Sequence, residues 1–408
     1  MSKNVVLVFF LALGFQSFSQ IEKPKELSRN FELSTLPYYN FGKGVGITSP
    51  DSLFEFNIRF RMQNRLAYVH KDDAEVEDKI EAETRRLRLR FDGYVGDPRF
   101  RYAIQLSFSP GDTGKTIEGE NEQIIRDAVI FYQPSRHWSF SFGQTKLPGN
   151  RQRVNSSGAL QLTDRSINNA DFNIDRDFGV QAHYLNEYQE KFSYNIRTAI
   201  STGEGRNDTK NSDTGLAYTA KVELLPLGAF KNSGSYFEGD IIREASPKLL
   251  LSAGFSHNDR ASKTKGQSGT RLFEKRNLSS LFLDAMLKYN GWSFQTAYLS
   301  RAANDPMTVN PIDPTEISFV YVGSGMDYQL SYLFLNNYEL SGRFSNQKMH
   351  KDIQSFAPDK NQYSLGLTKY IWEHSFKIQT EATLDQINDF NGQTKNNWYV
   401  RFQIEIGI

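Results

Sequence analysis

Residues 53–69 read LFEFNIRFRMQNRLAYV, and the alternation in this stretch decides the fold. Most alternate side chains are apolar and those between them are polar or charged, so one strand carries two chemistries on opposite faces. Strands of soluble sheets usually hold such a pattern over about six residues. A strand that crosses a membrane at a tilt needs about ten. The length of this stretch therefore favours a membrane-crossing strand.

The same period of two returns along the chain and predicts sixteen strands, at 53–69, 87–95, 100–108, 128–132, 138–142, 178–184, 192–196, 218–224, 249–255, 281–289, 292–298, 328–334, 340–344, 363–367, 376–384 and 398–408. Short turns alternate with longer polar segments, at 70–83, 109–124, 147–175, 203–213, 257–277, 302–324, 348–360 and 386–396. One link, 226–247, is long where a short turn is expected. Tight turns at one end and long loops at the other are typical of an outer-membrane barrel.

The sequence therefore predicts an all-β fold, a transmembrane antiparallel β-barrel of about 16 strands over residues 51–408. In such a barrel the apolar face of each strand contacts lipid, and the polar face lines the lumen. A barrel of this size is too wide for wall side chains to fill and leaves a water-filled interior. An even number of strands brings both termini to the periplasmic side.

Composition excludes several other classes of protein. The 408 residues carry 48 Lys and Arg against 47 Asp and Glu, which argues against nucleic-acid binding through bulk positive charge. With no Cys there is no disulfide, zinc–thiolate site or cysteine nucleophile. After residue 20 no apolar run approaches the ~20 residues of a membrane-spanning helix.

The first residues have the pattern of an export signal. Lys3 precedes an apolar core, and small residues follow at Ser17 and Ser19. This order predicts a signal peptide of residues 1–19, cleaved before Gln20, with an uncleaved membrane anchor as the alternative. Residues 20–50 are then expected to form an N-terminal segment on the periplasmic side, and the protein to reside in the outer membrane of a Gram-negative cell.

Several blocks of sequence resemble the phosphate-selective porin O and P family, in the version found in Bacteroidetes-type bacteria. The blocks are FGKGV at 41–45, FGQTKLP at 142–148, DRS at 164–166 and RDFGVQ at 176–181. The resemblance implies a sixteen-stranded pore, usually a homotrimer, that passes small solutes or inorganic anions such as phosphate. It also implies that the loop after the fifth strand, here 147–175, folds inward as a constriction.

The strongest chemical feature is a stripe of seven arginines on the lumen parity of the first three strands: Arg59, Arg61, Arg65, Arg86, Arg88, Arg90 and Arg101. Guanidinium groups bind phosphate and carboxylate oxygens in pairs, and rings of cations favour anions in pores. The stripe is therefore a candidate anion filter. The competing interpretation is structural, because such arginines can also brace an acidic inward loop. Weak selectivity and a cation-leaning pore stay open as well.

The constriction loop and the residue before it add weaker candidates, namely Lys146, Arg151, Arg153 and Arg165. No catalytic residue is predicted, because the six His lack H-E-x-x-H or metal spacing and no G-x-S-x-G occurs. We therefore expect no enzyme, no cofactor and no metal site.

Two functional hypotheses follow. The first is a channel through which small solutes diffuse passively, with or without a preference for anions. Its pore is narrowed by the loop, and outer-membrane lipids surround it. The second is a barrel that serves as scaffold or partner subunit of a larger secretion or uptake assembly. The second predicts an occluded lumen and an apolar patch on an exposed loop or on link 226–247, which contains Phe230, Tyr236 and Phe237.

Overall fold

The computed structural model of the chain describes residues 44–113, 123–208 and 213–408. The predicted signal peptide, residues 1–19, and residues 20–43 of the predicted periplasmic segment lie outside the described residues. The described residues all belong to the compact unit Ser34–Ile408.

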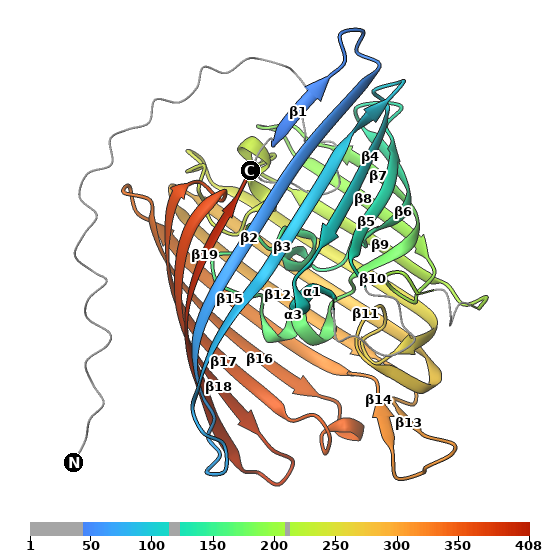
Figure 1. Cartoon of the computed structure of the whole chain (residues 1–408), viewed down its shortest axis with the longest axis vertical. Coiled ribbons are helices and arrows are strands. Elements are labelled where there is room, and N and C mark those ends of the chain that lie inside the picture. Colours follow the sequence, from blue (N-terminus) through green and yellow to red (C-terminus); the bar gives the residue numbers. More distant parts are fainter. Residues whose placement is uncertain (1–43, 114–122, 209–212) are drawn as a thin grey trace. The chain divides into compact units, whose positions relative to one another are not determined.

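Sixteen antiparallel strands form one closed ring (Figure 1). They are β2 (Phe54–His70), β3 (Lys79–Val95), β4 (Phe100–Ser107), β5 (Ile125–Tyr132), β6 (Trp138–Lys146), β7 (Arg176–Asn186), β8 (Ser193–Ser201), β9 (Ala217–Leu225), β10 (Lys248–Lys263), β11 (Arg271–Tyr289), β12 (Trp292–Ala302), β15 (Gly323–Leu333), β16 (Tyr338–Met349), β17 (Asp359–Trp372), β18 (Phe376–Asn388) and β19 (Thr394–Gly407). Each pairs with the next along the chain, and β19 pairs with β2. The predicted strand number is confirmed.

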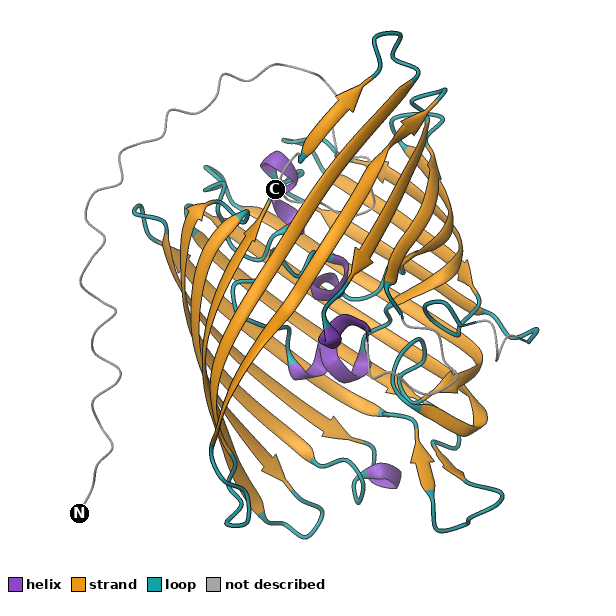
Figure 2. Ribbon diagram, viewed as in Figure 1, coloured by secondary structure: helices purple, strands orange, loops and turns teal. Residues whose placement is uncertain are grey.

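Three short strands and several short helices accompany this ring within the described residues (Figure 2). Strand β1 (Val45–Thr48) pairs with the start of β2, so the sheet begins within the segment predicted to precede the barrel. Strands β13 (Met307–Val309) and β14 (Ile317–Phe319) form a hairpin between β12 and β15. The helices are short: α1 (Pro110–Thr113), α2 (Arg151–Val154), α3 (Ile167–Phe172), η2 (Lys231–Tyr236) and η3 (Lys351–Ile353).

The barrel has its polar side chains inside and its apolar side chains outside. Along β9 buried and exposed residues alternate without a break. Its charged residues Lys221 and Glu223 are each only 1% exposed, whereas the apolar Val222 between them is 42% exposed. Aromatic pairs such as Trp292 with Tyr332 lie on the outer surface, with ring centroids 4.7 Å apart. This inverted distribution is what lipid contact requires.

Several strands run further than the alternation predicted. Strand β3 begins at Lys79, and β10 and β11 leave only residues 264–270 between them, so the loops predicted at 70–83 and 257–277 are shorter. Backbone hydrogen bonds continue the ladder beyond the lipid band. Because water contacts both faces of a strand there, its residues need not alternate between apolar and polar. The alternation in the sequence therefore stops before the strand ends.

No helix within 44–113, 123–208 or 213–408 has both the length and the apolar character to cross a membrane.

The loop between β6 and β7, residues 147–175, lies inside the ring, as expected (Figure 2). Helix α3 packs against β12, β15 and β16, on the side of the barrel away from β2 and β3. Buried lysines of the wall hold the loop backbone: Lys377 donates hydrogen bonds to the carbonyls of Gly158 and Leu160, at 2.9 and 2.7 Å.

Link 226–247 also folds into the lumen, from the opposite end of the barrel. Its aromatic residues Phe230, Tyr236 and Phe237 are buried. Lys288 of β11 donates hydrogen bonds to the carbonyls of residues 234, 237 and 239 at 2.6 to 2.9 Å. These aromatics therefore pack the interior, and the exposed apolar patch that the scaffold hypothesis expected on this link is not there.

Candidate functional site

A cavity of about 510 Å³ lies between the constriction loop and the wall formed by β3 to β7. Ten cationic side chains line it: Arg85, Arg86, Arg88, Arg126, Lys146, Arg153, Arg165, Arg176, Arg206 and Arg401. Four carboxylates share this lining, Asp112, Asp164, Asp175 and Asp385. The excess of six positive charges lies in a chain whose overall charge is nearly balanced.

A second, smaller cavity of about 50 Å³ adjoins the first and shares Arg88, Gln105 and Ser156 with it. It is lined by Arg59, Arg61 and Arg90, and it reaches Ser375 and the C-terminal Ile408 at the end of the barrel that carries the short turns. Together the two cavities trace a route along the arginines of β2 and β3.

The register of β2 against β3 places like charges side by side. Arg59 lies opposite Arg90, and Arg61 lies opposite Arg88. Like charges in directly opposite positions destabilise a sheet. Asp92 offsets part of this repulsion because both Arg59 and Arg90 donate to its carboxylate, at 3.0 and 3.3 Å.

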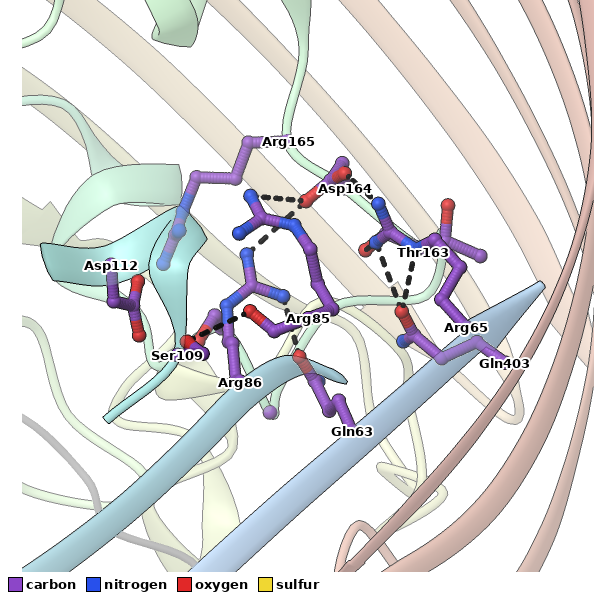
Figure 3. A network of polar contacts seen from close by, with 12 residues as sticks. Gln63, Arg65, Arg85, Arg86, Ser109, Asp112, Thr163, Asp164, Arg165 and Gln403 are labelled. Carbon is purple, nitrogen blue, oxygen red and sulfur yellow. Dashed lines mark hydrogen bonds and ion pairs between the residues drawn. The ribbon is translucent and has the colours of Figure 1, made fainter. Parts of the chain in front are cut away.

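Asp164 of the constriction loop is the centre of the largest network (Figure 3). Its carboxylate lies 2.7 Å from Arg65, 3.1 Å from Arg86, 3.3 Å from Arg85 and 3.4 Å from Arg401. Burial by itself raises the pKa of the Asp164 carboxyl, but these four guanidinium groups together hold that pKa well below its usual value. One carboxylate thus fastens the loop to strands β2, β3 and β19.

Two further contacts fix the same wall. Asp112 of α1 accepts a hydrogen bond from Arg88 at 2.6 Å and forms an ion pair with Arg126 at 3.1 Å. Arg61 reaches the loop from the other side, where it donates to the hydroxyls of Ser156 and Ser157 at 3.1 and 2.6 Å. The arginines are therefore held in place by partners that several of them share.

Two β-bulges turn additional arginines toward the cavity. The register of β2 on β3 shifts between Gln63 and Asn64, which leaves Arg85 as the extra residue of β3. The register of β4 on β5 shifts between Gln105 and Leu106, which leaves Arg126 as the extra residue of β5. Bulges commonly re-aim a side chain in this way. Strict alternation assigns both arginines to the lipid face, so sequence reasoning missed them.

The structure brings eight of the predicted residues to the two cavities: Arg59, Arg61, Arg86, Arg88, Arg90, Lys146, Arg153 and Arg165. Two of these also support the loop backbone. Lys146 donates to the carbonyls of Val154 and Asn155, and Arg165 donates to those of Gln152 and Asn155.

The other three predicted residues line neither cavity. Arg65 joins Asp164 to Gln403, and Arg101 pairs with Glu55 at 3.3 Å. Arg151 pairs with Glu223 at 2.9 Å and lies over the ring of Tyr236. Arg206, which lines the larger cavity, comes from a loop in which no sequence pattern pointed to it. Within the described residues no group of His, Asp and Glu has the arrangement of a metal site.

A family model described as phosphate-selective porin O and P matches residues 56–325, which is more than half of the chain. The chain belongs to this porin family. It is therefore an outer-membrane channel, as the resemblance of its sequence blocks implied, and it is not an enzyme.

Solved structures share the fold of this porin. The outer membrane channel DcaP of Acinetobacter baumannii has a TM-score of 0.57 at 13% identity, over 89% of this chain and 100% of that one. OmpF of Salmonella typhi has 0.56 at 11%, over 88% and 100%. An anion-selective porin from Comamonas acidovorans has 0.52 at 9%, over 87% and 100%. Identities this low show the fold alone. Comparison with curated proteins gave no match.

Proposed function

We propose that this porin conducts small solutes passively with a preference for inorganic anions, phosphate among them, and that the arginines of β2 and β3 supply the preference. The observation that carries the proposal is the lining of the two adjoining cavities. The larger has ten cations against four carboxylates, and the smaller is lined by Arg59, Arg61, Arg88 and Arg90 of β2 and β3. The family description, which names phosphate, supports it.

The structural and the filtering interpretations of the arginines are compatible. Asp164 is shared by four arginines, Asp92 by two and Asp112 by two. Each shared carboxylate fixes several guanidinium groups but neutralises only one charge. The surplus positive charge is left facing the water of the route, where an anion gains attraction from several donors at once.

The test is the reversal potential of single channels in a KCl gradient. The double variant Arg61→Gln, Arg88→Gln removes two of the cations that line the smaller cavity. We expect the ratio of chloride to potassium permeability to fall at least about fivefold, because even one charge about 4 Å from an ion in water contributes a Boltzmann factor of that size. Arg101→Gln is the matched control, because Arg101 shares the lumen parity but lies in neither cavity. An unchanged ratio in the double variant would assign the arginines to bracing alone.

We also infer, from the sequence signal and the family, that residues 1–19 are removed on export and that three copies assemble. The mass of the mature N-terminus and cross-linking in membranes test these two points. A mature chain that retains residue 1, or cross-linking that stops at the monomer, would refute them separately.

A further inference from the structure

The constriction loop has a second side, which lies against strands β15 to β18. Three carboxylates of that wall point into the lumen, Asp327 of β15, Glu339 of β16 and Glu381 of β18. They are 8%, 1% and 2% exposed. If these three carboxylates faced open water, they would attract cations. Whether a permeating ion is attracted to them therefore depends on which groups of the protein cover them.

Uncharged groups of the loop cover all three acids. Ser166 and Asn168 donate to Asp327 at 2.6 and 2.8 Å. The side-chain amide of Gln161 donates to Glu339 at 2.5 Å. No Lys or Arg of the described residues lies within 4.0 Å of these three carboxylates, which sets them apart from the acids of the arginine wall.

Glu381 is covered most closely. The backbone N–H and the hydroxyl of Thr163 donate to the same carboxylate oxygen of Glu381, at 2.7 and 2.6 Å. The next residue of the loop is Asp164, which faces the other way, into the arginine network. Two adjacent residues of the loop thus have different partners. Thr163 covers the carboxylate of Glu381, and Asp164 holds arginines in place.

Glycines in the wall let the loop lie this close. A Cβ atom at Gly325 would lie 1.8 Å from the amide oxygen of Asn168, and one at Gly366 would lie 2.4 Å from a methyl group of Leu162. Both distances are shorter than atoms can approach. The loop and the wall therefore touch backbone to side chain, with no room for a layer of water or ions between them.

We propose that loop residues 161–168 determine the ion preference of the pore by shielding Asp327, Glu339 and Glu381 from the solute route. Ten cations and four carboxylates line the larger cavity, so three more exposed carboxylates would halve its excess of positive charge from six to three. Covering one wall's acids with neutral donors leaves the arginine wall as the charge that a solute meets. This inference deepens the proposed anion preference, since it states why arginines prevail in a balanced chain.

The test loosens the cover without changing any charge. The triple variant carries Gln161→Ala, Thr163→Ala and Gly325→Ala. The first two changes each remove one side-chain donor, and the third displaces Asn168 from the wall. We expect its ratio of chloride to potassium permeability to fall about fivefold, the effect of one newly exposed charge about 4 Å from the ion. If the ratio stays within the scatter of the native channel while the barrel remains folded, the proposal is wrong.

Isosteric amides supply the matched control. Glu339→Gln and Glu381→Gln keep the one acceptor oxygen that the loop donors use. Asp327→Asn keeps the acceptor for Asn168 and presents its amide NH2 to the hydroxyl of Ser166, which can accept instead of donate. In the native loop these three changes together should leave the permeability ratio unchanged, because the acids are already hidden. In the loosened loop they should restore the native ratio. A large effect of the amides in the native loop would show that ions already sense these acids, which contradicts the proposal.

A chemical readout separates this inference from the proposed anion preference. The chain has no Cys, so a single introduced thiol reports one position. Ser331→Cys, beside Glu339, should resist a charged thiol reagent in the native loop and react in the loosened one, whereas Ser156→Cys in the cavity should react in both. This result would support shielding even if the native pore proved unselective. Equal reactivity of Ser331→Cys in both loops would refute it.

Discussion

At the scale of single residues, Asp164 links the loop to the pore wall more than any other acid described here. Its carboxylate has four arginine partners from three strands. Because the folded state holds the pKa of Asp164 well below its usual value, the ionised form stabilises the fold. That contribution is complete above the unfolded pKa of about 3.9 and is lost as the pH falls below it toward the folded pKa.

Asp164→Asn should therefore lower the stability of the barrel by about 1–3 kcal/mol at pH 7, since buried guanidinium donors lose a charged acceptor. Heat-induced unfolding followed on gels measures this difference. The difference between native and variant should be the same at pH 7 and pH 5, and it should shrink only below about pH 3.9. A difference that already vanishes at pH 5 would show that the Asp164 carboxyl titrates near its ordinary value.

At the scale of elements, the two β-bulges decide which arginines face the cavity. Arg85 and Arg126 lie on the lipid parity of their strands, yet both line the larger cavity. Each is the unpaired extra residue at a register shift. Each bulge leaves one residue out of the backbone hydrogen-bond ladder and places one more cation in the lumen.

The double variant Arg85→Gln, Arg126→Gln should therefore reduce the ratio of chloride to potassium permeability at least about fivefold, because even one lost charge about 4 Å from the ion has an effect of that size. Single-channel reversal potentials measure it, with Arg101→Gln again as the control. A preserved permeability ratio in the inserted double variant would instead mean that these two side chains do not act on the permeating ion.

The strands could be predicted from the sequence, but the two bulges and the direction of link 226–247 could not. Alternation located all sixteen strands because lipid on one side and water on the other impose a period of two on every membrane-crossing segment. It could not locate Arg85 or Arg126, since a bulge resets the parity without a mark in the sequence. Nor could it show that link 226–247 turns inward, because its aromatics Phe230 and Phe237 suit a buried plug and an exposed docking site equally well.

At the scale of the whole molecule, two segments from opposite ends of the barrel meet in the lumen and displace the route toward one wall. Glu238 of link 226–247 joins them, since it accepts hydrogen bonds from Gln152 and from the backbone of Gln161 at 2.9 and 3.0 Å. The inward direction of loop 147–175 was anticipated only from the family resemblance, because the contacts that hold it come from strands far away in the sequence.

Replacing residues 229–240 with a short turn should raise single-channel conductance, because it removes packing from the lumen. Lys288→Gln is combined with the replacement so that no buried ammonium group is left without its three carbonyl acceptors. Lys288→Gln alone is the control and should change conductance much less. Equal conductance of the shortened and native channels would mean that link 226–247 does not limit the flow.

The joint between β2 and β19 has a consequence for how the barrel forms. Every other pair of neighbours in the ring is joined by a single loop or, between β12 and β15, by the β13–β14 hairpin, so each pair can form from residues near in sequence. The joint instead brings Arg61 beside Gly407 and His70 beside Trp398. Contacts this distant in sequence must wait until almost the whole polypeptide is arranged, and folding slows as such long-range contacts come to dominate. Closure of this seam is thus the step expected to set the rate of refolding, and until it occurs two unpaired strand edges remain open to aggregation.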